Sequence, residues 1–354
     1  MITTVSSEIA ARVAAWRAAW PEPLDSGMRG MAEAGLFALG LTVGGDYGTI
    51  ARTKEKLVEA TGLPGLAGMW AGRQMISRFF LGRFGTPEQL SVFMPCLTDG
   101  TAAFSVAISE PGVGAHPKHL TTQAVADGTD VIITGQKAWV SNALEATHII
   151  VFAIIGGTAA RKLYSAFLVP TGTPGLAIAP MEGFHALAPS RHCAVSLDGC
   201  RVAATARLGP EGTAFEAMAV PFRDVEDAVG AAGFAGAARF ALRGLAQVVP
   251  EAADAELGAI AGLAAVLEHG ARAVVAALDR GRLHDEAAAG VGLRVLAADI
   301  RARIGALIDA TAPLPDPVRD RLLADLDAIL GIARGPRAIR QARLGAQFRL
   351  SPRG

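Results

Sequence analysis

The spacing of apolar residues changes twice along this 354-residue chain and divides it into three parts. Residues 1–100 and 213–354 repeat apolar side chains every three or four positions, which is typical of amphipathic helices. Residues 101–212 form short alternating runs between Gly, Pro and Asp turns, which predicts strands. We therefore expect an α+β protein with an N-terminal helical domain, a middle β-barrel or sandwich domain and a C-terminal helical bundle. Within the first part, residues 30–41 are expected to form an amphipathic helix.

The balance of charges and the cysteines argue against several classes of protein. Lys and Arg number 33 and Asp and Glu number 33, so no net field attracts nucleic acid or an anionic membrane. The apolar run Leu257–Leu267 is stopped by Glu268, so we expect no membrane span. No secretory signal is visible at the N-terminus. Cys96, Cys193 and Cys200 lack metal-ligand spacing, so we expect a reduced, cytoplasmic protein without a metal site.

A stretch of strand followed by glycines begins the middle part. Phe104–Ala115 alternates apolar and small residues, and it then breaks at Pro111, Gly112 and Gly114. Because glycine has no Cβ, backbone N–H groups in such a loop can approach a flat or anionic ligand closely.

A second stretch, Ile133–Asn142, follows in the same part of the chain. It is expected to form a strand, a turn at Gly135 and a second strand, with Trp139 and Ser141 on one face. An indole and a hydroxyl opposite a glycine-rich loop suit the wall of an aromatic cofactor site. Core packing of Trp139 between the β-domain and the helical bundle is the alternative.

These two stretches resemble the acyl-CoA dehydrogenase family. Ser109-Glu-Pro-Gly-Val-Gly-Ala-His116 resembles the family pattern Thr-Glu-Pro-Gly-x-Gly-Ser-Asp, and Gly135-Gln-Lys-Ala-Trp-Val-Ser-Asn142 resembles Gly-x-Lys-x-Trp-Ile-Thr-Asn. Gly85-Thr-Pro-Glu-Gln89 is similar to the Gly-x-x-Glu-Gln helix start of the family. The resemblance implies the same three-part fold and bound FAD.

In the family, the two stretches hold the isoalloxazine ring of FAD. Ser109 and Ser141 stand for threonines and keep a hydroxyl for the ring edge, whereas Ala115 replaces a serine. The cofactor residues that the resemblance implies are Val106, Ala107, Ile108, Ser109, Gly114, Ala115, Trp139, Val140 and Ser141.

The catalytic base is the clearest departure from the family. Most members use the Glu of a Glu-Gly-Thr segment, where this chain has Arg334 and Gly335. A guanidinium cannot accept a proton at neutral pH. Isovaleryl-CoA and long-chain members instead carry a Glu seven residues before a Gly-x-x-Gly pair, and Glu226 precedes Gly233 and Gly236 in this way. Glu226 is therefore the candidate base.

Other residues around these positions are candidates for the substrate site. They are Asp224, Asp227, Arg334 and Gly335. Asp224 to Asp227 also fits a solvated acidic face at a helix start. Arg334 could lower the pKa of Glu226, recognise a carboxylate on the substrate, or point to solvent.

Two family segments that reach the pyrophosphate and adenine of a partner subunit's FAD have no counterpart. Nothing in Gly244–Glu256 matches Arg-x-x-Phe-Gly, and Asp309–Pro315 replaces Gln-x-x-Gly-Gly-x-Gly. The sequence therefore supports the ring half of an FAD site and leaves the nucleotide half unsupported.

The resemblance implies an enzyme that removes the α-proton of an acyl-CoA thioester and transfers the β-hydrogen as hydride to flavin N5. A homodimer or homotetramer is expected, with electron-transfer flavoprotein as a candidate partner. One alternative is a member without catalysis that binds acyl-CoA or a partner subunit as a scaffold. Another is a flavin monooxygenase on the same fold.

His116 and His119 have no nearby Cys or acid at ligand spacing, so we expect no metal there.

Overall fold

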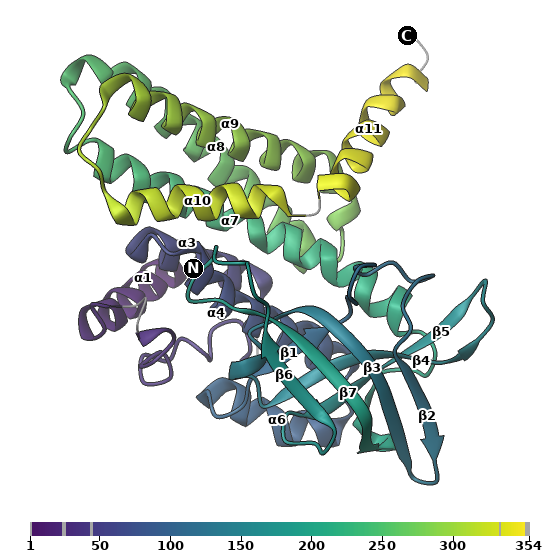
Figure 1. Ribbon diagram of the computed structural model, residues 1–354. Coiled ribbons are helices and arrows are strands. Elements are labelled where there is room, and N and C mark those ends of the chain that lie inside the picture. The colour runs from purple at the N-terminus through teal and green to yellow at the C-terminus, as the bar shows by residue number, and fades with distance from the viewer. Residues whose placement is uncertain (1, 23–25, 43–44, 333, 351–354) are drawn as a thin grey trace. The chain divides into compact units, whose positions relative to one another are not determined.

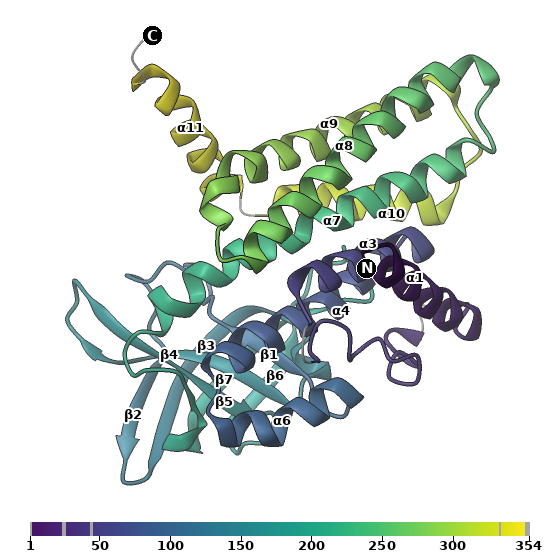
Figure 2. The ribbon, with the colours of Figure 1, turned by 180° about the vertical axis from the view of Figure 1, so that it is seen from behind.

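The computed structural model describes residues 2–22, 26–42, 45–332 and 334–350 (Figures 1 and 2). The chain divides into two compact units. The helical unit comprises Met1–Leu24, Asp46–Ala67 and Asp227–Gly354, and the sheet unit comprises Asp25–Gly45 and Gly68–Glu226. Within the described residues, the strands all lie between Phe104 and Leu208, with helices before and after them in sequence. The predicted α+β fold is therefore confirmed.

The sheet unit is built on an eight-stranded mixed sheet in the order β6-β7-β3-β2-β4-β5-β8, in which β1 also pairs with β4. The pairs β1–β4 and β2–β4 are parallel, and the others are antiparallel. Alternate side chains, such as Ile133, Val151 and Val195, form its core. The strands are β1 (Phe104–Ala107), β2 (Gln123–Asp127), β3 (Asp130–Ser141), β4 (His148–Gly157), β5 (Lys162–Pro170), β6 (Leu176–Pro180), β7 (His192–Ala203) and β8 (Arg207–Leu208).

Gly135 does not form the expected turn. The strand β3 runs through it from Asp130 to Ser141, with a shift of register between Ile133 and Gly135. A Cβ at Gly135 would lie 2.5 Å from the hydroxyl oxygen of Thr122. The turn prediction was wrong because this glycine allows a close approach between backbone segments, which a single sequence cannot distinguish from a turn.

A buried ion pair ties the loop after β1 to β3. Lys137 Nζ donates to Glu110 Oε1 at 3.0 Å and to the carbonyl oxygen of Ile108 at 3.2 Å. Thr121 and Thr122 each donate a backbone N–H and a hydroxyl to the Glu110 carboxylate, at 2.6 to 3.0 Å. Burial raises the pKa of Glu110, but the hydrogen bonds from Thr122 and the charge of Lys137 outweigh burial and lower this pKa to about 2.

The helical unit contains a bundle in which α8 packs against α3 and α9. Figures 1 and 2 both show α8, α9 and α10 running side by side. The helices of this unit are α1 (Ile2–Ala19), α3 (Tyr47–Thr61), α8 (Asp254–Asp279), α9 (Ala287–Thr311), α10 (Pro317–Gly331) and α11 (Arg334–Leu350). Helices α4 (Pro64–Ile76) and α7 (Val220–Leu245) run from one unit into the other, and α6 (Pro87–Asp99) belongs to the sheet unit.

Helix α8 bears on the expectation that no segment spans a membrane. By length and composition alone, Glu251–Asp279 could cross a bilayer, although a core helix of a soluble protein meets the same criterion. Its buried residues, which include Ile260, Leu267 and Val274, recur at helical spacing. The arrangement is that of a bundle helix with one buried face.

Residues 30–41 form successive turns, so the predicted helix there was wrong. Gly30, Gly35 and Gly40 have φ angles of 75°, 65° and 82°. These left-handed conformations interrupt the regular helical hydrogen bonds. Gln74 Nε2 donates to the carbonyls of Phe37 and Leu39 instead, both at 2.7 Å.

Close packing joins α7 to α3 within the helical unit. A Cβ at Gly236 would lie 2.3 Å from the carbonyl oxygen of Glu55, so only glycine permits this close approach of α7 to α3. Beside it, Arg239 forms ion pairs with Glu55, Glu59 and Glu268. Burial raises the pKa of Glu55, against the opposing charge of Arg239. The contact therefore brings buried charges together with their partners.

Replacing Gly236 with alanine is expected to destabilise the protein by about 2 kcal/mol, because the new methyl group collides with backbone that cannot move aside. The measurement is urea unfolding followed by circular dichroism. Gly230→Ala in the same helix is the matched control, since a Cβ there meets nothing within 4 Å. The control is expected to be neutral or slightly stabilising, and equal effects of the two substitutions would contradict the packing argument.

Replacing Lys137 with methionine is expected to cost about 3 kcal/mol, because it leaves the Glu110 carboxylate buried without its cation. Glu110→Gln should also destabilise, since it leaves the Lys137 ammonium unpaired. The double variant should lose at least about 1 kcal/mol less than the sum of the two single losses. Additive losses in a double-mutant cycle of urea unfolding would show that the pair is not coupled.

Candidate functional site

The glycine loop after β1 is open on one side. It closes on itself through two backbone hydrogen bonds between Glu110 and Gly114, at 3.0 and 3.1 Å. Gly112 and Gly114 have φ angles of 73° and 60°, and a Cβ at either position meets nothing within 4 Å. The two glycines therefore serve the backbone conformation of the loop, and the space beside them is available to a ligand.

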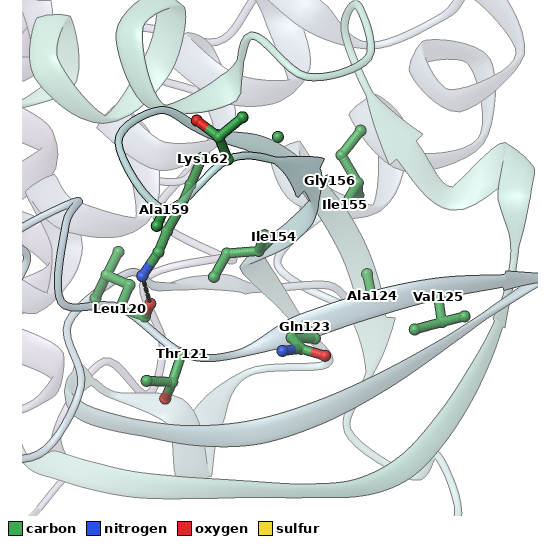
Figure 3. Close-up of a pocket in the computed structure, with 12 residues that line it drawn as sticks. Leu120, Thr121, Gln123, Ala124, Val125, Ile154, Ile155, Gly156, Ala159 and Lys162 are labelled. Carbon is green, nitrogen blue, oxygen red and sulfur yellow. Dashed lines mark hydrogen bonds between the residues drawn. The ribbon is translucent and has the colours of Figure 1, made fainter.

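The far end of the loop is fixed by side chains of β5. Tyr164 donates its hydroxyl to the carbonyl of Pro117, and burial is the main reason that the pKa of Tyr164 rises to about 12. Lys162 Nζ donates to the carbonyl of Lys118 at 2.8 Å. It also donates to the carbonyl of Leu120 at 2.7 Å (Figure 3). A cavity of about 460 Å³ opens beside Lys162, and none of the predicted site residues lines it.

The structure brings the two sequence stretches side by side. The backbone N–H of Ala138 donates to the carbonyl of Ser109 at 2.9 Å. The Ser105 hydroxyl donates to the carbonyl of Ser141 at 2.9 Å. Together with the bond from Lys137 to Ile108, these contacts align the strand and loop of the first stretch with the end of β3.

Trp139 faces solvent at a break in the strand pairing. Its φ angle is 60°, and the register between β3 and β7 shifts between Lys137 and Val140. The side chain of Trp139 is 51% exposed, whereas Val140 is fully buried. A bulge of this kind re-aims a side chain. The bulge therefore turns the indole out of the core of the sheet, and packing of Trp139 between the β-domain and the helical bundle stays an untested alternative.

Three rings, a hydroxyl and a thioether meet at this bulge. We name these residues the Trp139 cluster: Trp139, Ser141, Met181, Phe184 and His192. Trp139 meets Phe184 and His192 edge to face, with ring centroids 5.9 and 5.8 Å apart. Its backbone N–H donates to Met181 Sδ at 3.3 Å. Ser141 Oγ lies 3.0 Å from His192 Nδ1. Burial lowers the pKa of His192.

The predicted cofactor residues differ in what they offer to a ligand. Ala107 and Val140 are buried in the core of the sheet, so only their backbones could meet a ligand. Gly114, Trp139 and Ser141 are exposed, and Val106, Ile108, Ser109 and Ala115 are half-buried. An exposed indole, two accessible hydroxyls and an open glycine loop fit a flat aromatic ring with a polar edge.

The two segments that stand where the family binds the nucleotide half of FAD lack side chains suited to a pyrophosphate. Residues 246–253 connect α7 to α8, and residues 309–315 end α9 and lead toward α10. Neither segment contains a Lys or Arg, the side chains that commonly bind pyrophosphate. The division of the FAD site into a supported ring half and an unsupported nucleotide half therefore stays a prediction of the sequence.

The candidate base and the substrate candidates are distributed over both units. Glu226 is exposed in the sheet unit, one residue before the boundary in α7, and Asp224 is half-buried. In the helical unit, Asp227 binds Arg337 Nη2 at 2.8 Å and Arg340 Nη1 at 3.0 Å. Arg334 and Gly335 are exposed at the start of α11. The catalytic role of Glu226 stays a prediction.

Several residues of the site escaped the sequence argument. The pairing of Glu110 with Lys137 and the contact of His192 with Ser141 join positions 27 and 51 residues apart. Neither pair has a motif of its own. The available signal for the ion pair was that Glu110 and Lys137 each stand in one of the two stretches that resemble the family patterns.

Comparison with known proteins agrees with this geometry. Residues 105–200 match the acyl-CoA dehydrogenase middle domain. Acyl-CoA dehydrogenase FadE12 of Mycobacterium tuberculosis is 34% identical over 168 residues, 47% of this chain and 43% of that protein. The chain thus matches less than half the length of this curated relative.

Solved structures share the fold over nearly the whole chain. Butyryl-CoA dehydrogenase from Megasphaera elsdenii covers 97% of this chain and 98% of its own, with a TM-score of 0.84 and 18% identity. Acyl-CoA dehydrogenase from Bacillus anthracis, solved in complex with FAD, covers 98% of this chain and 67% of its own, with a TM-score of 0.83 and 19% identity. Residues 105–200 therefore match the middle domain of the acyl-CoA dehydrogenases, and the chain as a whole has the fold of solved acyl-CoA dehydrogenases.

Proposed function

We propose that this protein is a flavin-dependent acyl-CoA dehydrogenase. The observation that carries the proposal is the junction of the two middle-domain stretches, where the Ser109–Ala115 loop adjoins the exposed Trp139 and Ser141. A relative of the same middle domain is an acyl-CoA dehydrogenase, and a protein of the same fold has been solved with FAD. Oligomerisation and electron transfer to an electron-transfer flavoprotein are further parts of the proposal.

The residues of the junction would hold the ring of FAD. Trp139 offers an aromatic surface, and Ser109 and Ser141 offer hydroxyls to the polar ring edge. Backbone N–H groups near Gly112 and Gly114 can approach the ring because no side chain stands between. When bound, FAD supplies the hydride acceptor of the reaction.

Removal of the α-proton of the substrate needs a basic side chain of the protein, separate from FAD. Glu226 is the proposed base because it stands seven residues before Gly233, in the position of the base of isovaleryl-CoA and long-chain members, and because the residue is exposed on α7. Arg334, the residue at the usual base position, cannot accept a proton. In this proposal Arg334 contributes at most to substrate binding. The ion pairs of Asp227 with Arg337 and Arg340 give that acid a structural role at the junction of α7 and α11.

A different function, acyl-CoA binding without redox chemistry, is favoured by one specific observation. The segments 246–253 and 309–315 lack the cations that would support the FAD pyrophosphate. A protein of this kind would retain acyl-CoA and lose FAD. The two functions therefore differ in a property that can be measured before any substrate is known.

The freshly purified protein is expected to show the visible absorbance bands of bound flavin, or to acquire them when FAD is added and excess is removed by gel filtration. Trp139→Ala should reduce the retained FAD by at least about tenfold, since it removes the exposed aromatic surface. Val125→Ala serves as control, because Val125 is an exposed apolar residue of the same sheet outside the junction. A colourless protein that binds acyl-CoA by calorimetry would support the non-redox function instead.

Glu226→Gln is expected to lower the rate of acyl-CoA oxidation, measured with an artificial electron acceptor, by about 10²- to 10⁴-fold while leaving FAD content unchanged. The amide keeps the shape of the side chain and removes its basicity. Glu216→Gln is the control, since Glu216 is an exposed acid on the preceding helical segment. Full activity in Glu226→Gln would exclude this residue as the base.

A further inference from the structure

The Ser141–His192 contact places a titratable ring beside a hydroxyl that faces out of the protein. Ser141 Oγ and His192 Nδ1 are 3.0 Å apart, and Ser141 is exposed whereas His192 is half-buried. His192 also packs edge to face against Phe184, with ring centroids 4.9 Å apart. These contacts hold the imidazole in position, and its protonation state and tautomer then decide which partner donates in the bond to Ser141.

The protonation state of His192 decides what Ser141 can offer to a ligand. A neutral imidazole with an unprotonated Nδ1 accepts the Ser141 proton, so the hydroxyl presents its lone pairs outward. A protonated imidazole donates from Nδ1 to Ser141 Oγ, so the hydroxyl proton is free to point outward. Protonation of His192 thus changes the Ser141 hydroxyl from a hydrogen-bond acceptor to a hydrogen-bond donor toward a ligand.

The backbone around the cluster limits other arrangements. Trp139 holds a left-handed conformation that is unusual for a bulky residue. The N–H of Met181 donates to the carbonyl of His192 at 2.8 Å, while Met181 Sδ accepts from the N–H of Trp139. Strain at an exposed aromatic residue, retained by contacts from the loop after β6 and from the start of β7, points to a ligand-facing role.

We propose that His192 sets the orientation of the Ser141 hydroxyl at the flavin ring and thereby makes FAD affinity depend on pH. This inference rests on the proposed function, because it requires that the ring of FAD lies against the Trp139 cluster. His192 is a positioning residue, since it acts through Ser141.

The direction of the pH dependence follows from burial. Burial alone lowers the pKa of His192 in the free protein. A ring that covers the cluster excludes more water and lowers the pKa further. FAD therefore binds the neutral form better, so its affinity is complete above the pKa of the free protein and falls as pH drops through it.

Charged groups near His192 do not account for the lowering of its pKa, which burial causes. Glu182, His185 and Arg191 lie on the segment that leads into β7, and within the described residues none forms an ion pair or hydrogen bond with the His192 ring. On β3, the ammonium of Lys137 is buried against Glu110. His192 is thus the group of this cluster that is expected to titrate.

The test measures the Kd of FAD for the full chain from pH 5 to 8 by quenching of flavin fluorescence. Wild-type affinity should fall by about tenfold between pH 8 and pH 5, the factor for a one-unit change in the pKa of His192 on binding. His192→Asn should bind FAD with an affinity that varies less than about twofold over this range. Ser141→Ala should bind FAD more weakly and show a shallower pH dependence than wild type, because the ring still buries His192 but the hydroxyl no longer responds to its protonation.

His185→Asn is the matched control, since His185 is an exposed histidine on the neighbouring loop, and it should retain the wild-type pH profile. Histidine ring resonances in NMR give a second readout on the wild-type protein, where the pKa of His192 should decrease on adding FAD. A pKa that FAD leaves unchanged, or a pH profile as steep as that of wild type in His192→Asn or Ser141→Ala, overturns this inference alone. Absence of FAD binding at every pH overturns both it and the proposed function.

Discussion

The buried ion pair between Glu110 and Lys137 is the interaction on which the candidate site depends. Burying either charge alone is costly, so each requires the other and the donors of Thr121 and Thr122. The same ammonium holds the carbonyl of Ile108. The pair therefore fixes the position of the glycine loop relative to β3, and the open side of that loop follows from it.

The other half of the site follows from a defect in the sheet. Where the pairing of β3 with β7 shifts its register, Trp139 leaves the core while Val140 stays in it. Contacts from Met181, Phe184 and His192 stabilise this local strain. A regular strand would have needed no such support, and it would have offered no exposed indole beside Ser141.

In the helical unit, a close contact between two helices lies beside a group of partly buried ion pairs. Gly236 lets α7 approach the backbone of α3, and the ion pairs of Arg239 then form in partly buried surroundings. Asp227 connects the beginning of this region to α11. Within the acidic run at 224–227, Glu226 is exposed and Asp227 is half-buried against two arginines of α11.

The sequence by itself determined the order of helices and strands, because hydrophobic period is a local property, and it determined the two glycine-containing stretches, because their residue types and spacing are distinctive. It failed at residues 30–41 and at Gly135, since glycines at positive φ or in close contact look alike in a sequence. Only the tertiary structure decided that Trp139 faces solvent and that His192 meets Ser141. Those outcomes depend on register shifts and on contacts between distant residues, whose energies no local pattern records.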